Sequence, residues 1–365
     1  MAKLDCPLLI SPVFKPKIWG RKNLAPLFDR TEAATGRSSS AVAAQSPIGK
    51  SNLIGEVWIT NDQSRFLNGA VAGLTLDEAS RKYRSDLNGS RWTNERFPLL
   101  AKYIYTSDWL SVQVHPDDAY ARAHDPGSPG KCEMWYFVHA EKDAVILLGL
   151  KAGVTHDKLR AALENGTARD ILHRFHPHAS EAAYIPPGMI HALGPGLVLF
   201  EVEQNSDLTY RLDDFGRVGL DGKPRPLHLK KGLEVTKVEL PAFRDLPRIE
   251  LREAFGLRRY VLASRHFALE ELTVKEIATM SGSPDRVEVL SVLEGEGRVE
   301  TEAGWLGCET GDTWLIPPAT KRYRVVPRKK IRMLRFYVPV IEKDFRKPLL
   351  KRGVARKKIE TICFE

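Results

Sequence analysis

Cysteine is scarce in this chain, and long hydrophobic runs are missing. The four cysteines, at positions 6, 132, 308 and 363, are widely scattered and show no Cys-x-x-Cys spacing. This excludes a thiolate zinc knuckle and argues against a disulfide framework. No apolar stretch approaches the ~20 residues of a membrane-spanning helix, and the first residues do not have the pattern of a signal peptide. We therefore expect a protein of the reducing cytoplasm with no membrane partner.

A glycine-rich nucleotide-binding loop and a basic motif interleaved with aromatic residues are also missing. The net charge is +9, from 55 basic and 46 acidic side chains, and basic residues cluster at 328–330 and 351–358. We interpret these clusters as solvated faces of the protein. No nucleic-acid partner is expected, whereas an anionic small substrate agrees with the positive balance.

The composition is that of an ordinary globular protein. With 365 residues, 43% hydrophobic and 28% charged, the chain is long enough for two domains with sizeable cores. Short runs rich in branched and aromatic residues recur between prolines and glycines, which predicts a mainly β protein. Two stretches read as helical instead: a capping box formed by Thr75 and Glu78 predicts a helix to about residue 87, and apolar spacing predicts a helical segment between 155 and 175.

The most informative stretch is residues 110–118, Leu-Ser-Val-Gln-Val-His-Pro-Asp-Asp. Ser111, Gln113 and His115 alternate with Val112 and Val114, which is the pattern of a half-buried strand. Because alternate residues of a strand share one face, the three polar side chains point the same way. The proline and the two aspartates that follow are typical of a turn.

Two further candidate ligands follow at strand-like positions. Glu133 lies in the segment Gly-Lys-Cys-Glu-Met-Trp-Tyr, and His191 follows a Pro-Pro-Gly turn. Together with Gln113 and His115 they form a nitrogen and oxygen ligand set that suits zinc, with manganese, iron or cobalt also possible. Taken one at a time, each residue also has a structural interpretation, since a single strand histidine is more often a hydrogen-bonded core residue than a ligand.

The three motifs occur in a family-specific order. Gln-Val-His-Pro-Asp-Asp at 113–118, Gly-Lys-x-Glu-Met-Trp-Tyr at 130–136 and Pro-x-Gly-x-x-His at 186–191 resemble the motifs of the type I mannose-6-phosphate isomerases, a family of metal-dependent cupins. The resemblance is closest to the short bacterial members and extends from about residue 12 to 216, with a weaker match beyond. It implies a mainly β fold of two cupin-type β-barrels (jelly rolls) with a small helical insertion. It also implies one Zn²⁺ per chain, bound by the ligands Gln113, His115, Glu133 and His191.

The resemblance also implies catalytic residues. The segment Thr-Tyr-Arg-x-x-Asp at 209–214 resembles the family's active-site segment, so Arg211 matches its arginine. A structural arginine paired with Asp213 or Asp214 is the alternative. Lys131 shares a strand face with Glu133 and is the second catalytic candidate. It can act as a base if a nearby cation lowers its pKa, or as a contact to phosphate or hydroxyl; a solvated lysine is the alternative.

Substrate contacts are expected at two further residues. Trp19, in an early Trp-Gly pair, resembles the family's N-terminal segment near the substrate pocket, with simple core packing as an equal alternative. Ser111 shares the strand face of Gln113 and His115 and is a candidate contact to phosphate, as is Arg21.

The chain is predicted to contain four segments in order. They are an N-terminal segment that completes the first barrel and contains a flexible loop, a catalytic metal-binding cupin with a helical insertion, a connection, and a C-terminal cupin-like domain: 1–98 with loop 31–51, 99–218 with insertion 153–176, 219–259, and 260–365. In the last segment Arg322 stands where the first barrel has His191, counted from its turn. We therefore expect a weak internal duplication whose second copy binds no metal.

The implied activity is the interconversion of mannose 6-phosphate and fructose 6-phosphate. The proton moves between C1 and C2 through an enediol(ate), and the partner is a small-molecule sugar phosphate. A monomer and a homodimer both agree with the sequence. Two other functions stay open: a non-catalytic cupin that binds sugar phosphate, and another metal-dependent cupin enzyme such as an oxygenase.

Overall fold

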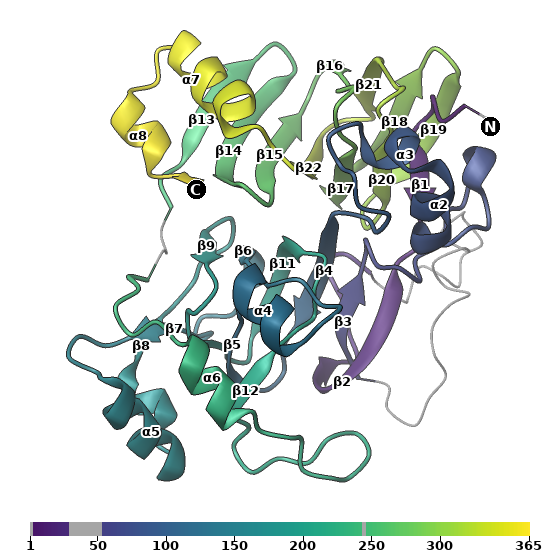
Figure 1. The fold of residues 1–365 in the computed structure, drawn as a ribbon. Coiled ribbons are helices and arrows are strands. Elements are labelled where there is room, and N and C mark those ends of the chain that lie inside the picture. Colours follow the sequence, from purple (N-terminus) through teal and green to yellow (C-terminus); the bar gives the residue numbers. More distant parts are fainter. Residues whose placement is uncertain (1–2, 29–52, 243–245) are drawn as a thin grey trace.

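The structure is a computed structural model that describes residues 3–28, 53–242 and 246–365. The predicted loop at 31–51 lies outside these residues. The described chain forms four sheets and few helices, so the predicted mainly β architecture is confirmed. Figure 1 shows the sheets as a lower and an upper pair, with both labelled ends of the chain in the upper part.

The lower pair contains a six-stranded and a five-stranded sheet. In spatial order the six-stranded sheet is β2 (Val13–Arg21), β3 (Ile54–Trp58), β4 (Leu99–Tyr105), β11 (Leu197–Gln204), β6 (Glu133–Ala140) and β9 (Ala182–Ile185). The five-stranded sheet is β12 (Tyr210–Asp213), β5 (Val112–Val114), β10 (His191–Leu193), β7 (Ile146–Leu150) and β8 (Leu172–Phe175). One apolar cluster, with Ile104 and Trp135 from the first sheet and Leu148 and Leu193 from the second, fills the space between them.

The upper pair contains an eight-stranded and a four-stranded sheet. The larger sheet is β1 (Leu8–Ile10), β20 (Thr313–Ile316), β17 (Glu288–Glu294), β22 (Ile331–Tyr337), β15 (Ala268–Val274), β14 (Gly256–Ser264) and β13 (Ile249–Glu253), with β23 (Cys363–Phe364) beside β14. The smaller sheet is β16 (Ala278–Ser281), β21 (Arg322–Pro327), β18 (Glu296–Thr301) and β19 (Gly304–Glu309). β1 therefore pairs with a strand about 300 residues later in the chain.

The central strands of the six-stranded sheet are buried on both faces. All seven residues of β4 are buried, and their side chains alternate between two environments. Tyr103 and Tyr105 join an apolar cluster that also contains Leu334 and Phe336 of the upper pair. The opposite face of the six-stranded sheet packs towards the five-stranded sheet, and the site described below lies on that face.

Helices cover the outer surfaces. The five-stranded sheet packs against α5 (His156–Glu164) and α6 (Leu229–Val235), and α7 (Lys347–Lys351) and α8 (Arg356–Glu360) pack in the upper part. Among the described helices, none is both long enough and apolar enough to cross a membrane. The helical segment predicted between 155 and 175 contains α5 and η3 (Ala168–Ile171), but its last four residues form β8 because they pair with β7.

The predicted capping box is present. The backbone N–H of Glu78 donates to Oγ1 of Thr75 at 3.2 Å, and the backbone N–H of Thr75 donates to Oε2 of Glu78 at 2.7 Å. These bonds satisfy free donors at the start of α2 (Leu76–Tyr83). The helix does not run to residue 87 in one piece, because Arg84 has a φ of 44° and a separate short helix, α3 (Ser85–Asn88), follows it.

Candidate metal centre and active site

Three predicted ligands converge inside the lower pair of sheets. The candidate ligand atoms of His115, Glu133 and His191 all lie within 4.8 Å of one another. Nε2 of His191 is 3.4 Å from Oε1 of Glu133, and Nε2 of His115 is 3.5 Å from Oε2. β10 and β5 are neighbours in one sheet, with His191 opposite Gln113, while Glu133 projects from the facing sheet. All three side chains are fully buried.

Both histidines are fixed in the tautomer that a metal requires. Nδ1 of His115 lies 2.9 Å from the carbonyl oxygen of Leu208, and Nδ1 of His191 lies 2.9 Å from that of Met189. A carbonyl can only accept, so Nδ1 carries the hydrogen and Nε2 keeps a lone pair directed into the cluster. Burial, reinforced by the nearby Lys131 ammonium, lowers the pKa of His115 to about 4, and burial also lowers the pKa of His191. Both rings are therefore neutral near pH 7.

The carboxylate of Glu133 completes the cluster. Burial alone would raise its pKa, but Lys131 and His115 hold the pKa well below the usual range. Nζ of Lys131 lies 2.5 Å from Oε2. Among the described residues, no donor forms a hydrogen bond with Oε1, although this oxygen is buried. A buried, charged oxygen beside two imidazole lone pairs fits a bound divalent cation.

Gln113 lies at the edge of this cluster. Its side-chain amide Nε2 is 3.1 Å from Nε2 of His191, and its Oε1 accepts a hydrogen bond from Ser111 at 3.3 Å. The side chain is half-buried, whereas the other three are fully buried. The amide is thus close enough to reach a metal held by the cluster, and its role as a fourth ligand stays a prediction.

A cavity of about 200 Å³ adjoins the cluster, and its walls contain the other predicted site residues. Trp19, Ser111, Lys131 and Arg211 all line it together with Gln113. Trp19 is buried, and two cations lie near its ring. The remaining lining residues are Lys17, Glu56, Lys102, Ile104, Leu110, Trp135, Leu193, Glu201, Asp207, Thr209 and Arg225.

Arg21, the other candidate for phosphate, is turned elsewhere. Its Nε donates to the carbonyl oxygen of Thr106 at 2.8 Å, and its Nη2 pairs with Glu141 at 2.9 Å. It does not line the cavity. Arg21 is the last residue of β2, and its orientation could not be predicted from the sequence because its partners are 85 and 120 residues away.

Three buried charged residues of the site were missed in the sequence. Nζ of Lys102 lies 2.9 Å from Oε2 of Glu201 and 3.1 Å from Oε1 of Glu203. The other oxygen of Glu203, Oε2, lies 2.9 Å from Nζ of Lys131. Burial raises the pKa of both glutamates. A usable signal was present, because a lysine inside a seven-residue apolar strand and two glutamates at alternate positions of another must be paired if they are buried.

Arg211 is not the structural arginine of the alternative interpretation. Asp214 is bound instead by Arg217 and Arg225. Within the described part of the chain Arg211 has no carboxylate partner; its Nη1 donates to the carbonyl oxygen of Pro226 at 2.9 Å, and its buried Nε donates to no acceptor. Burial and the neighbouring Arg225 lower the pKa of Arg211. An underused guanidinium beside a cavity is suited to an anionic ligand.

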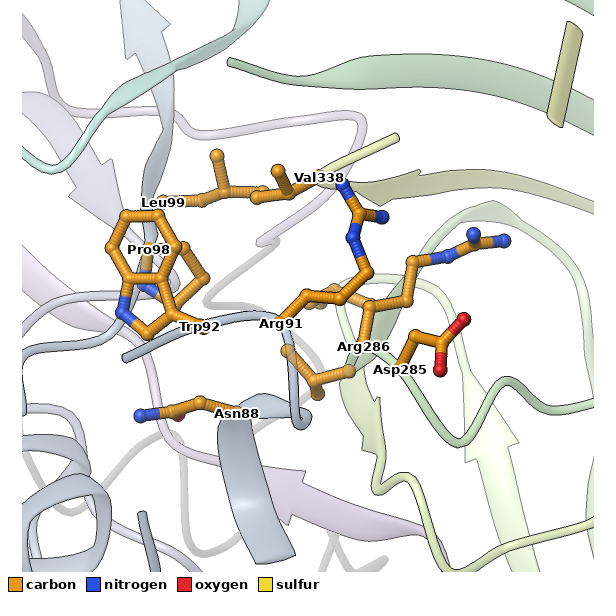
Figure 2. Close-up of a pocket in the computed structure, with 10 residues that line it drawn as sticks. Asn88, Arg91, Trp92, Pro98, Leu99, Asp285, Arg286 and Val338 are labelled. Atoms are coloured by element: carbon orange, nitrogen blue, oxygen red, sulfur yellow. The ribbon is translucent and has the colours of Figure 1, made fainter. Parts of the chain in front are cut away.

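A second cavity is separate from this site. Figure 2 shows Asn88 and Trp92 on one side of it, Asp285 and Arg286 on the other, and Arg91 between them. Its volume is about 40 Å³, and its lining includes no histidine, cysteine or glutamate. It therefore has no part in the metal cluster.

Paired β-sheets around a buried His, Glu and His cluster that fits a metal ion are the architecture of a cupin. Comparison with known proteins narrows the class. Residues 8–131 match the family model of the phosphomannose isomerase type I catalytic domain. The chain is 34% identical to the mannose-6-phosphate isomerase ManA of Bacillus subtilis (strain 168) over 316 residues, which are 85% of this chain and 93% of that protein. The chain therefore belongs to the type I mannose-6-phosphate isomerase family.

Solved structures agree with this assignment. The crystal structure of the mannose 6-phosphate isomerase from Bacillus subtilis superposes with a TM-score of 0.78 at 26% identity, covering 91% of this chain and 99% of that one. A zinc-bound mannose 6-phosphate isomerase superposes with a TM-score of 0.65 at 15% identity, covering 92% and 100%. The second likeness shows the shared fold, and the predicted two-barrel cupin architecture is confirmed.

Proposed function

We propose that this protein interconverts mannose 6-phosphate and fructose 6-phosphate. The observation that carries the proposal is the cluster of His115, Glu133 and His191 beside the substrate-sized cavity, in a chain of the mannose-6-phosphate isomerase family. A sugar phosphate is the expected small-molecule partner, and the free cysteines of the described chain fit the reducing cytoplasm.

The metal we propose is one Zn²⁺ per chain. Two neutral imidazoles and a carboxylate are ligands that zinc accepts, and Gln113 is the proposed fourth. One zinc-bound relative has the same fold. When bound, the metal supplies Lewis-acid polarisation of the substrate carbonyl and a template that orients it.

Lys131 is proposed to act as a proton-bearing contact rather than as the base. Burial alone would lower its pKa, but Glu133 and Glu203 raise it above the usual range. The ammonium is therefore retained at neutral pH and can donate to a substrate oxygen. Glu201 is the proposed proton acceptor, because it lines the cavity and burial raises its pKa, which makes its carboxylate a stronger base than an exposed one.

Arg211 is proposed to stabilise negative charge on the enediolate oxygens. Its guanidinium is charged across the working pH range and lines the cavity with a free donor. A fixed positive charge that meets an oxygen whose charge grows in the transition state lowers the barrier. Trp19 and Ser111 are proposed to contact the sugar, since both lie on the cavity wall.

Turnover distinguishes this function from the other two classes. The purified protein, loaded with zinc, is given mannose 6-phosphate in an assay coupled to fructose 6-phosphate, while dissolved oxygen is recorded. Product formation without oxygen consumption is the expected result. Binding of the sugar phosphate without turnover would mean a binding module, and oxygen uptake would mean an oxygenase.

A further inference from the structure

We propose that Arg225 binds the phosphate group of the substrate and makes the cavity selective for sugar phosphates over free sugars. This inference deepens the proposed isomerase function and rests on it. Arg225 lies in the loop between β12 and α6, which projects at the bottom of Figure 1. Its side chain lines the substrate cavity, as does that of Arg211.

Hydrogen bonds fix the backbone of this loop on both sides of Arg225. Val218 and Pro224 form an isolated β-bridge, and the N–H of Gly219 donates to the carbonyl oxygen of Lys223 at 2.8 Å. On the other side, Pro226 accepts the hydrogen bond from Arg211 at 2.9 Å. The arginine therefore follows directly after a closed turn and precedes a residue anchored to the cavity wall.

Asp214 fixes the orientation of the guanidinium. Nε of Arg225 donates to Oδ2 of Asp214 at 2.7 Å, and Nη2 donates to Oδ1. Asp214 is only 5% exposed. Burial alone would raise its pKa, but Arg225 and Arg217 hold the pKa below the usual range, so the carboxylate stays ionised. A two-point contact to a buried carboxylate leaves Arg225 little freedom to rotate.

This contact leaves donors for a ligand. A guanidinium carries five N–H donors, and Asp214 uses two of them. Among the described residues, no acceptor binds Nη1 of Arg225, and the buried Nε of Arg211 is also without a partner. Arg225 lies close enough to Arg211 to lower the pKa of that guanidinium, and the carboxylate that Arg225 contacts, Asp214, is already shared with Arg217. The surplus positive charge is suited to a dianion.

The other cations of the cavity are already neutralised. Lys102 lies between Glu201 and Glu203, Lys131 contacts Glu133 and Glu203, and Lys17 pairs with Glu56 at 3.2 Å. The reacting carbons of a hexose 6-phosphate are at the opposite end from its phosphate. If the carbonyl end faces the metal cluster, the phosphate requires a cation at some distance from it, and Arg225 contacts none of the three ligands.

The test compares Arg225→Ala with a matched control. We expect KM for mannose 6-phosphate to rise about 10- to 100-fold with kcat changed only a few-fold, the size of losing one charged hydrogen-bonded contact. Inhibition by inorganic phosphate should weaken by a similar factor. Arg225→Lys should recover only part of the loss, because lysine lacks the planar fork that reaches Asp214 and the phosphate together.

The control is Arg217→Ala. Arg217 contacts the same Asp214 oxygen at 2.8 Å and is equally exposed, 17% against 18%, but it does not line the cavity. Its substitution should leave inhibition by inorganic phosphate within a few-fold of the wild type. Equal weakening in both variants would mean that loosening Asp214, rather than losing a phosphate contact, causes the effect, and would overturn the inference.

The outcomes also separate this inference from the proposed function. If the wild type isomerises mannose 6-phosphate and Arg225→Ala keeps both KM and phosphate inhibition, the isomerase stands and the role of Arg225 is wrong. If the wild type shows no turnover, the proposed function is wrong, and calorimetric binding of inorganic phosphate decides the role of Arg225. Binding that is lost in Arg225→Ala supports an anion site, and equal binding overturns it.

Discussion

At the scale of single residues, the site depends on hydrogen bonds made by atoms that never touch substrate. The carbonyl oxygens of Leu208 and Met189 hold Nδ1 of the two histidines, and this decides which nitrogen is left for the metal. The oxygen of Leu208 could not be identified from the sequence, because it lies 93 residues from His115, whereas Met189 is only two residues from His191. The residue types alone indicated the candidate ligands, whereas the distant carbonyl oxygen that orients His115 left no signal in the sequence.

His191→Ala should abolish tight metal binding and activity together. The substitution removes one of three converging ligands and leaves a gap between two strands of the five-stranded sheet. Elemental analysis and the coupled assay measure the two losses. His178→Ala, at an exposed position, is the matched control and should change neither. A His191→Ala protein that keeps its full metal content would contradict the assignment of this ligand.

Arg211→Ala should lower kcat about 10²- to 10³-fold, the scale of removing one oxyanion donor, and raise KM far less. Metal content should be unchanged, because Arg211 is not a ligand. Steady-state kinetics on Arg211→Ala and Arg211→Lys, with metal content measured in parallel, provide the test. An unchanged kcat with a raised KM would make Arg211 a substrate clamp instead.

At the scale of elements, alternation along strands explains most of the site. β4, β6 and β11 each direct one face to the apolar cluster shared with the upper sheets and the other to the cavity. The predicted strands therefore placed Glu133 correctly. Lys102 and Glu201 were not recognised, because single-strand patterns do not show which residues of different strands lie opposite one another, and Lys102 is paired with Glu201 only through strand register.

Thr75→Ala should lower the free energy of unfolding by about 1 kcal/mol, since it removes the side-chain acceptor of the capping box at α2. Thr75→Ser keeps the hydroxyl and should retain most of the stability. Denaturant unfolding of the three proteins measures the difference. If alanine and serine destabilise equally, the hydrogen bond to Glu78 contributes nothing.

The turn before β20 should make stability depend on pH. Burial raises the pKa of Asp312 to about 7, above its ordinary 3.8, so the folded state resists ionisation. Between these values the folded state holds more protons than the unfolded state, and this contribution to stability is lost as the pH rises from about 4 to about 7. Asp312→Asn cannot ionise but keeps an oxygen for the N–H of Glu309. Its stability relative to the wild type should increase through this range, measured by thermal unfolding at each pH. A constant difference would contradict the raised pKa.

At the scale of the whole molecule, the two pairs of sheets share one apolar interface. The chain passes from the upper pair to the lower pair close to its N-terminus. β1 joins the upper sheet beside β20, whereas β2 and β3 join the lower sheet. Strands that pair over such sequence distances leave no local pattern in the sequence. The predicted segment boundaries after residues 98, 218 and 259 stay predictions. Arg225, which belongs to the predicted connection at 219–259, lines the cavity.

The family motifs are dense in the strands of the lower pair of sheets, and there they indicate the same candidate residues as the strand patterns do. Both signals are weaker in the C-terminal part of the chain. The described residues contain the two candidate clusters around Glu133, both in the lower sheets. Arg322 lies exposed at the start of β21. The C-terminal domain is accordingly still predicted to bind no metal, and that expectation enters the measurement below.

One buried metal site, in the lower pair of sheets, is proposed to carry the isomerase activity. Activity of the chelated full-length protein, titrated with zinc and plotted against equivalents bound, tests this proposal most directly. Activity should be lost on chelation, return in proportion to bound zinc and reach its plateau at one equivalent per chain. Undiminished activity in the metal-free protein, or a plateau reached only at two equivalents, would contradict the proposal.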